Sequence, residues 1–592
     1  MTSLTDGKVT LNSNYQNGNR CDFRCLYPKN DYLLTYGPWL DINSAKPDCD
    51  IVEVVCFNEN NTKIYTTLHT QVYNNQTYKN STPKGKNFLN KASFKFPKML
   101  KKPDDRPPDV HIILFDSVSY SAFIRTMERT RYVLNNDLGA IRFSRLNKNG
   151  MNSRPNAFAF LLGKLLYGVK KNILHPEIPS DCHEDCCKDP MDDDEQFIAF
   201  HFKKAGYKTL MSEDWSDGVF NLNGMMCAAF TKPPVDHYMR PFHLRVEGEF
   251  FSEWKQKGKN GELYKNLYRE SCREPHHYLI EYLKQFIDKY PDEPKFSLSW
   301  MVYLAHNDQN GMYHTDEYFY RFFRDYREKL QNSYIIIMGD HGPRFGKLRD
   351  TKVGMFEDNN PSLFFVAPEK IRANKEIMWT LQENSKQLIS HYDLYATLVD
   401  IVRRSDPFQA NKKLILHGAS FLEPLPQPRN CVDLKIPIEY CQCEFNKVSK
   451  SNDIMLTRSL AKFMVFTINE KIRQHNYSHL CAFLKLDPRA SVEMEEFEPG
   501  SGLNIYQVTV QVQPGGGRFW GYFHAKYDKY EKPSYELISE SMPRLNTYGG
   551  QECPDLHPLI TPYCYCRDEK NHFVDPKLGH RIDIYTYVNI TL

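Results

Sequence analysis

Short apolar runs alternate with amphipathic segments through the middle of the chain. Residues 110–115 and 333–338 are almost wholly apolar and rich in β-branched side chains. Runs of this length and composition predict strands that are buried on both faces. Each run ends abruptly on polar residues, Asp116-Ser117 after the first and Gly339-Asp340-His341-Gly342 after the second.

Further strands and helices follow the same alternation. Strands are expected at residues 207–211, 296–304 and 361–368, and helices at 157–166, 197–205, 274–289, 316–330 and 393–403. Strands that alternate with helices favour a mostly parallel sheet with helices on both faces.

The two ends of the chain have a different pattern. Residues 50–56 and 63–68 alternate like strands, and so do residues 502–512 and 518–523. A polar, proline-rich stretch at 101–108 has the composition of a linker. We therefore predict three parts: a cysteine-bearing β-rich module at 1–107, a catalytic α/β domain at 108–428, and a disulfide-stapled β-rich module at 429–592.

Composition and charge exclude several classes of protein. The chain has 592 residues, of which 41% are hydrophobic and 14% aromatic, so it is not mainly disordered. Its net charge is only +3 and no Lys/Arg block dominates, which gives no support for nucleic acid as a partner. No run of 18 apolar residues is present, so we expect no transmembrane helix in this chain.

The cysteines and sequons indicate an oxidising compartment. Sixteen cysteines occur, many at C-x-C, C-x3-C and C-x6-C spacings, which favour disulfides over the C-x2-C knuckles of zinc ribbons. Five N-x-S/T sequons are candidate glycosylation sites: Asn60, Asn75, Asn80, Asn476 and Asn589. We expect a secreted or lumenal protein, although the N-terminus lacks the apolar core of a signal peptide, so the targeting segment is expected to be absent from this chain.

One cysteine pattern occurs twice. Cys431, nine residues, then Cys441-Gln442-Cys443 resembles Cys553, ten residues, then Cys564-Tyr565-Cys566. The echo predicts two similar disulfide-stapled turns.

Three sites along the chain carry candidate chemistry. Asp116 and Asp340-His341 each end a predicted strand, where ligands bind in open α/β sheets, and Asp with His suits a divalent metal such as zinc. Ser153 precedes a predicted helix, as an N-cap or as a nucleophile aided by the helix dipole. If the three converge, a bound cation could activate the Ser153 hydroxyl toward an ester. Asp340-His341 could equally be an ordinary strand-ending turn.

These residues carry a family resemblance. Phe115-Asp116-Ser117, Asn152-Ser153-Arg154-Pro155-Asn156, Gly339-Asp340-His341-Gly342-Pro343-Arg344 and Ile436-Pro437-x2-Tyr440-Cys441-x-Cys443 stand in the order of the alkaline-phosphatase superfamily. The chain most resembles that superfamily's DUF229 group of animal extracellular proteins.

The resemblance implies a fold and a metal site. It implies an alkaline-phosphatase-like α/β/α sandwich with Asp116, Ser153, Asp340 and His341 around one metal, most simply zinc, with manganese or calcium as alternatives. A second metal would need further ligands, for which Asp308 and His417 are candidates. His306 would be a further ligand or, as in headgroup transferases, would bind a substrate oxyanion. Solvated loop side chains are the alternative for His306, Asp308, His314 and His417.

The implied activity is a metal-dependent hydrolase or transferase of phosphoesters with Ser153 as nucleophile. Its partners would be phosphorylated or sulfated small molecules, lipid headgroups or glycans. Sulfatases carry Cys/Ser-x-Pro-x-Arg, but Ala157 stands at the Arg position here, which speaks against that alternative. The other alternative is a non-catalytic binding module that keeps the enzyme fold in the extracellular space. The oligomeric state does not follow from the sequence.

Overall fold

The computed structural model forms two compact units. One comprises Met1–Phe445 with Ile538–Glu540, and the other Asn446–Leu537 with Ser541–Leu592. The predicted three-part division stays a prediction. The structure describes residues 1–15, 18–74, 106–188, 190–221, 227, 229–248, 261–308, 310–406, 413–443, 446–546, 548, 553, 556 and 559–567.

A seven-stranded sheet lies at the centre of the first unit. Its strands in spatial order are β12 (His237–Tyr238), β11 (Lys208–Glu213), β13 (Lys295–Met301), β8 (Asp109–Phe115), β14 (Ser333–Met338), β15 (Leu363–Val366) and β9 (Ile141–Arg142). The five strands from β12 to β14 pair in parallel, whereas β15 runs antiparallel to both of its neighbours. The sheet is therefore mostly parallel, as predicted.

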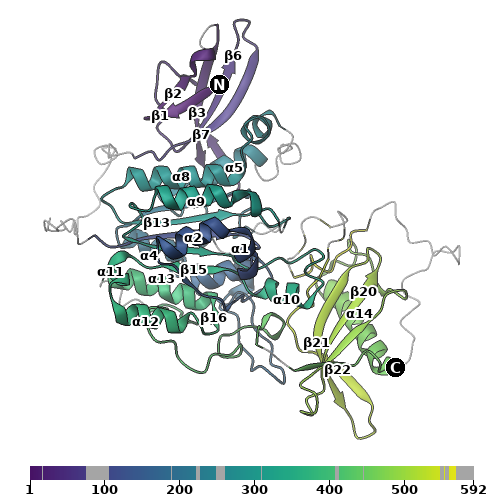
Figure 1. The fold of residues 1–592 in the computed structure, drawn as a ribbon. Coiled ribbons are helices and arrows are strands. Elements are labelled where there is room, and N and C mark those ends of the chain that lie inside the picture. The colour runs from purple at the N-terminus through teal and green to yellow at the C-terminus, as the bar shows by residue number, and fades with distance from the viewer. Residues whose placement is uncertain are drawn as a thin grey trace, which may run out of the picture. The chain divides into compact units, whose positions relative to one another are not determined.

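Helices cover both faces of this sheet (Figure 1). Alternate strand residues enter two separate apolar cores, Ile112 and Ile336 on one face and Ile113 and Ile337 on the other. The first core includes residues of α4 (Ile198–Lys204), α12 (Lys375–Asn384) and α13 (His391–Ser405). The second includes residues of α1 (Tyr120–Thr126), α2 (Glu128–Asn136), α5 (Arg240–Glu247), α8 (Pro275–Lys289) and α9 (Asp316–Asp325). The predicted α/β/α sandwich is confirmed.

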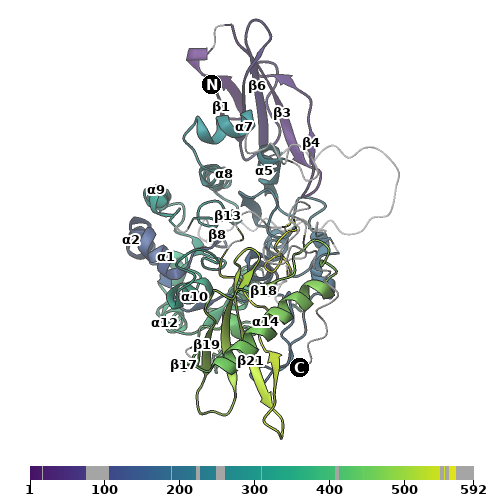
Figure 2. The ribbon, with the colours of Figure 1, turned by 90° about the vertical axis from the view of Figure 1, so that its right-hand side faces the viewer.

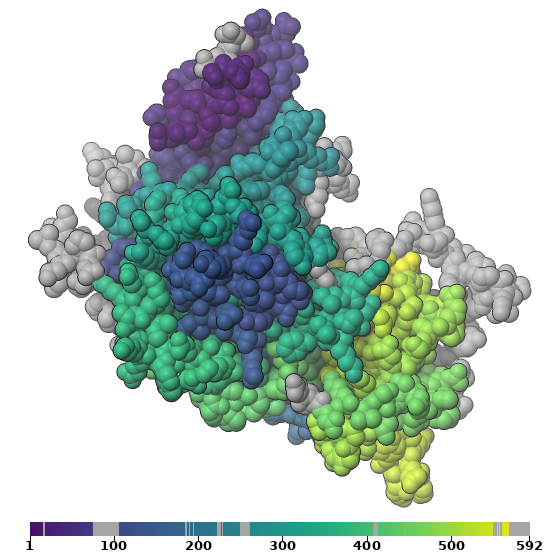
Figure 3. Space-filling model, viewed as in Figure 1, coloured from purple at the N-terminus to yellow at the C-terminus, as the bar shows by residue number. Residues whose placement is uncertain are grey.

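Shorter elements complete this layer. They are α3 (Ser153–Ala157), α7 (Glu262–Tyr264), α10 (Lys352–Asn359), α11 (Glu369–Arg372), β10 (Leu146–Asn147) and β16 (Ile389–Ser390). The helix expected at 157–166 begins earlier, at Ser153, and continues as a π-helical segment, Phe158–Leu162. In Figure 3 the blue atoms of α1 and α2 lie against teal and green atoms of later segments, so distant parts of the chain form one surface.

An N-terminal sheet belongs to the same unit. It contains β3 (Arg20–Pro28), β4 (Leu34–Tyr36), β5 (Leu40–Asp41), β6 (Ile51–Phe57) and β7 (Lys63–Thr70), beside a hairpin of β1 (Thr2–Thr5) and β2 (Lys8–Leu11). Two disulfides, Cys21–Cys56 and Cys25–Cys49, cross-link it. Buried Glu53 on β6 binds Arg245 of α5 at 2.6 Å, which fastens this sheet to the α/β layer.

The second unit is a sheet with one long helix. Its strands are β17 (Lys447–Ser449), β18 (Lys485–Leu486), β19 (Glu493–Phe497), β20 (Ile505–Gln513), β21 (Arg518–Tyr527) and β22 (Pro533–Leu537). Helix α14 (Ile454–Gln474) begins at the capping residue Asp453 and lies along the sheet (Figure 2). Its buried Leu460, Met464 and Ile468 share a core with the strands.

Candidate metal centre and nucleophile

The strand register brings Asp116 and Asp340 together. Met338 of β14 pairs with Leu114 of β8, so the residues two positions further on leave the sheet at the same level. Both aspartates therefore lie at the carboxyl edge of adjacent parallel strands. Gly339 is required between strand and ligand, because a Cβ there would lie 2.2 Å from the Val118 carbonyl oxygen.

Asp116, Asp340 and His341 form one compact group. One ligand atom from each lies within 4.8 Å of the others, and all three side chains are almost completely buried. Among the described residues, this is the one group with metal-site spacing that combines carboxylates with an imidazole. The predicted convergence of these residues is therefore present.

Hydrogen bonds orient the two carboxylates. Asp340 Oδ1 accepts from the backbone N–H of Ser117 at 3.1 Å and of His341 at 2.9 Å. Its Oδ2 is buried and has no hydrogen bond among the described residues. Asp116 accepts from the Ser117 hydroxyl at 2.8 Å and from the Trp300 indole at 3.4 Å. A buried carboxylate oxygen without a partner destabilises the fold unless it binds a cation or a proton.

The His341 ring is held in one tautomer. Its Nδ1 lies 2.7 Å from the Gly342 carbonyl oxygen, which can only accept, so Nδ1 carries the proton. The lone pair of Nε2 is then directed at the carboxylates, 3.4 Å from Asp340 Oδ2 and 3.9 Å from Asp116 Oδ1. Metal-binding histidines are commonly fixed by such a hydrogen bond from the other ring nitrogen.

The electrostatics of the group fit a divalent cation. Burial, together with the neighbouring Asp116 charge, raises the pKa of Asp340 well above its usual range. Burial, Arg344 and Lys148 lower the pKa of His341 well below its usual value, so its imidazole is neutral. A divalent cation would neutralise the two carboxylates and take the free imidazole lone pair, and zinc accepts this oxygen and nitrogen donor set.

Ser153 lies beside this group. Its hydroxyl donates to Asp116 Oδ2 at 3.0 Å and lies 3.4 Å from His341 Nε2. Asn152, not Ser153, is the N-cap residue of α3, so the hydroxyl is free of a capping role. The side chain of Asn156 braces the turn, because its Oδ1 accepts from the N–H groups of Asn149 and Gly150.

Two basic side chains, Arg344 and Lys148, lie near enough to act on the His341 ring. Only Arg344 was singled out from the sequence. Arg344, in the turn after His341, donates to His306 Nε2 at 3.2 Å. Lys148 is buried and binds Asp358 at 2.5 Å; burial lowers its pKa to about 8. The family motif includes Arg344, but nothing in the local sequence distinguishes Lys148 from an exposed lysine.

The candidates for a second metal lie outside the group. Asp308 is exposed and accepts from the Asn310 backbone N–H within its own turn. His417 pairs with Asp181 at 2.6 Å, and exposed His314 pairs with Glu274 at 2.8 Å. None of these side chains belongs to the group around Asp340. The role of Asp308 and His417 at a second metal stays a prediction.

Two further acidic residues lie at the same sheet edge: Glu213 is the last residue of β11, and Asp214 follows it. Asp214 is fully buried and accepts from the Val302 backbone N–H at 2.6 Å, while its Oδ2 has no hydrogen bond in the described structure. Burial raises the pKa values of Glu213 and Asp214 to about 8. Glu357 is buried in α10 and paired with Arg125 at 2.6 Å.

The sequence predicted disulfide bonds and glycosylation sequons, but not which cysteines pair. Seven disulfides are present among the described residues, which favours an oxidising, extracellular or lumenal environment. Across the described ranges, no helix is both long and apolar enough to span a bilayer. Asn60 and Asn476 are exposed, whereas Asn75, Asn80 and Asn589 lie outside the described residues. Glycosylation stays a prediction.

Fold and site together define an α/β/α protein with a buried Asp, Asp and His group suited to a divalent cation. The family model described as "Protein of unknown function (DUF229)" matches residues 9–489, and the chain belongs to this family. No curated protein sequence matches the chain.

Several solved structures resemble the fold weakly. They include a protein of the alkaline phosphatase superfamily from Vibrio parahaemolyticus (10% identity, TM-score 0.32, covering 74% of this chain and 83% of that one). The phosphonate monoester hydrolase SpPMH from Silicibacter pomeroyi has 11% identity and a TM-score of 0.34, over 73% of this chain and 89% of that one. The lipoteichoic acid synthase LtaP from Listeria monocytogenes has 10% identity and a TM-score of 0.32, over 54% of this chain and 76% of that one. At such low scores the likeness carries no argument about activity.

Proposed function

We propose that the protein is a metal-dependent hydrolase or transferase of phosphoesters in which Ser153 is the nucleophile. The observation that carries the proposal is the position of the Ser153 hydroxyl, 3.0 Å from Asp116 and 3.4 Å from His341. A serine hydroxyl is a weak nucleophile unless a base or a cation activates it. Here it lies against the group that fits a cation.

Asp116, Asp340 and His341 would hold the metal, with the Ser153 oxygen as a further ligand. A bound divalent cation would lower the pKa of the serine hydroxyl and offset charge on the phosphoryl group. Residues of the chain position the Ser153 hydroxyl and its proton. Asp116 Oδ2 accepts a hydrogen bond from the Ser153 hydroxyl, and Ser117 and Trp300 hold the Asp116 carboxylate in place.

The basic residues support an anionic substrate. Arg344 and Lys148 lower the pKa of His341, so their positive charge reaches the centre. Arg344 also orients His306 through a hydrogen bond, which leaves both side chains at one edge of the site. Lys148 is paired with Asp358, so a phosphate group is the expected counter-charge of Arg344, carried by a small molecule, a lipid headgroup or a glycan. We place the enzyme outside the cell or in a lumenal compartment, because of its disulfides.

Ser153→Ala tests the proposal. The full chain and the variant are assayed with zinc or manganese against matched phosphate and sulfate esters, and metal content is measured in parallel. We expect Ser153→Ala to lose activity toward phosphodiesters while it keeps its metal. Ser121→Ala, on α1, is the control and should stay active. Activity that survives in Ser153→Ala would remove serine as the nucleophile.

The two alternatives give different results in the same assay. A sulfatase would prefer the sulfate ester and show formylglycine in the residue 153 peptide by mass spectrometry. A non-catalytic binding module would show no turnover with either ester, whether or not metal is bound.

A further inference from the structure

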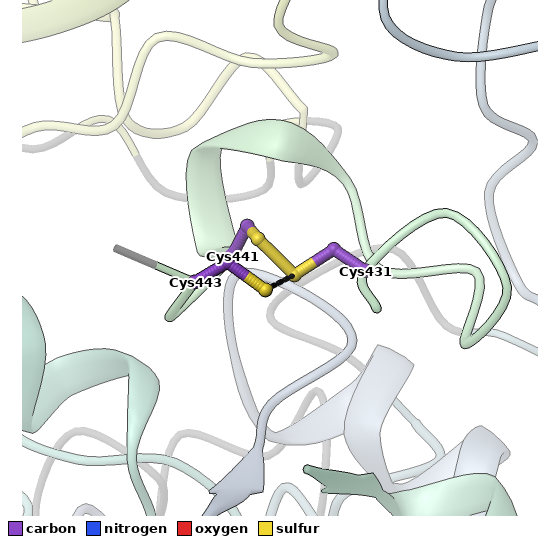
Figure 4. Close-up of side chains that lie close together, drawn as sticks. All are labelled: Cys431, Cys441 and Cys443. Atoms are coloured by element: carbon purple, nitrogen blue, oxygen red, sulfur yellow. Dashed lines mark hydrogen bonds between the residues drawn. A yellow bond between two sulfur atoms is a disulfide. The ribbon is translucent and has the colours of Figure 1, made fainter. Parts of the chain in front are cut away.

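Three cysteines lie together on the turn that follows the α/β layer. Cys431 and Cys441 form a disulfide, and the Cys443 sulfur lies 3.6 Å from the Cys431 sulfur (Figure 4). Cys443 is one of two cysteines with a free thiol in the described part of the chain. Cys431 is therefore within reach of two sulfur atoms from the same C-x-C segment.

We propose that this cluster is a thiol–disulfide exchange site, in which Cys431 pairs with either Cys441 or Cys443. The Cys443 thiol loses its proton to solvent, and its thiolate attacks the Cys431 sulfur. The Cys431–Cys443 bond forms as the Cys431–Cys441 bond breaks, and Cys441 leaves as a thiolate that takes up a proton. One disulfide replaces another, so no external oxidant or reductant is needed.

The second C-x-C turn of the chain shows the other pairing. There Cys553 is bonded to Cys566, the later cysteine of the C-x-C segment, while the sulfur of the earlier one, Cys564, lies 3.5 Å away. Cys564 is itself bonded to Cys481 and has no free thiol. The same local architecture therefore accommodates a bond to either cysteine, but only the Cys431 turn, among the described residues, keeps a thiol to drive the exchange.

Both pairings of Cys431 close loops of similar length. The partners are 10 residues away for Cys441 and 12 for Cys443. Loop-closure entropy changes slowly with length, so neither pairing has a large entropic advantage. Cys441 and Cys443 are partly exposed, so each can be reached by a thiol reagent.

The turn also contacts the segment that carries the nucleophile. Gln442, between the two cysteines, donates twice to β10: its backbone N–H to Asn147 Oδ1 at 2.8 Å and its side-chain amide to the Leu146 carbonyl at 2.7 Å. Met151, two residues before Ser153, packs against the same cluster. An exchange that moves Gln442 would therefore change the support of the nucleophile turn. This consequence for activity rests on the proposed function, whereas the exchange itself does not.

Disulfide mapping of the full chain tests the exchange. The oxidised protein is incubated with N-ethylmaleimide at neutral pH, quenched with acid, digested with pepsin and analysed by mass spectrometry. We expect two populations, one with labelled Cys443 and a Cys431–Cys441 bond, and one with labelled Cys441 and a Cys431–Cys443 bond. The labelled Cys441 population should vanish in Cys443→Ser and persist in Cys272→Ser, which removes the other free thiol. A wild-type map with no labelled Cys441 would overturn the proposal.

Cys441→Ser provides a second test. We expect Cys431 and Cys443 to be bonded in this variant, and both to be protected from N-ethylmaleimide. Finding both as free thiols in the folded variant would contradict the proposal. Because the readout is disulfide pairing, it does not depend on whether the protein is an active phosphoesterase.

Discussion

Two buried acidic sites lie at the carboxyl edge of the same sheet, yet only one has the form of a metal centre. Asp116 and Asp340 converge with the Nε2 lone pair of His341, and their ligand atoms lie within 4.8 Å of one another. Glu213 and Asp214 are adjacent in sequence, and burial raises the pKa of each to about 8. The described structure brings no imidazole and third ligand atom to that pair at such spacing.

The difference between the two sites shows that buried carboxyl groups alone do not make a cation site. A pair of carboxyl groups can meet the cost of burial by keeping protons, as Glu213 and Asp214 do near neutral pH. Asp340, whose pKa is also raised, differs because the neighbouring Asp116 and a neutral imidazole present acceptor atoms to the same point. Convergence of acceptor atoms, rather than acidity alone, identifies the candidate metal centre.

The largest expected effect comes from removing one ligand. Asp340→Asn should lose bound metal and at least about 100-fold of phosphodiesterase activity, since a lost transition-state interaction of about 3 kcal/mol has that effect on rate. Asp214→Asn is the matched control and should keep its metal. Metal analysis and steady-state assays check both variants. Equal metal loss in the two variants would break the distinction between the sites.

Metal removal should lower stability through the first site only. A cation present at 100 times its Kd stabilises the folded state by about 2.7 kcal/mol. Thermal unfolding with and without chelator should therefore show a lower Tm for the metal-free wild type and for metal-free Asp214→Asn. Asp340→Asn should not respond to chelator. An equal response of Asp340→Asn would place the stabilising cation elsewhere.

The Glu213 and Asp214 pair predicts that the free energy of unfolding depends on pH. The folded state holds the Asp214 proton up to about pH 8, whereas the unfolded carboxyl releases it near its ordinary pKa of 3.8. The free energy of unfolding therefore falls as pH rises through this window. Asp214→Asn keeps the acceptor for the Val302 N–H and should flatten that fall by more than about 1.4 kcal/mol, the value of one pKa unit. Denaturant unfolding at several pH values checks it; an unchanged slope would show that Asp214 is ionised when folded.

The smallest expected effect concerns the support of Asp116. Ser117→Ala removes the hydroxyl that donates to Asp116 Oδ1 at 2.8 Å but keeps the backbone N–H that binds Asp340. Loss of such an orienting partner typically lowers metal affinity by about 10-fold or more. Zinc titration by calorimetry measures it, with Ser121→Ala as the control. An unchanged affinity would mean that Ser117 does not position the ligand.

The sequence predicted the central fold and the three-residue group well, for a physical reason. Buried parallel strands need continuous apolar runs, and their ends are marked by sharp changes to polar residues, as at Asp116 and Asp340. The register that makes these two residues neighbours follows from strand order, which periodicity does not reveal.

Other features depend on contacts between distant segments. Lys148 is buried because Asp358, 210 residues away, meets it. Helix α14 was not predicted from its sequence, because its apolar residues are not confined to one face: Met455 and Phe466 are exposed, whereas Leu460 and Met464 pack on the sheet. The short thiol-to-disulfide distance at Cys431 likewise depends on how the turn folds.

Anomalous diffraction from crystals of the full chain grown with zinc tests the central claim most directly. The account predicts a zinc peak within bonding distance of Asp116, Asp340 and His341 Nε2, with the Ser153 oxygen beside it. No peak at this group under saturating zinc, or a peak only at other residues, would contradict the account.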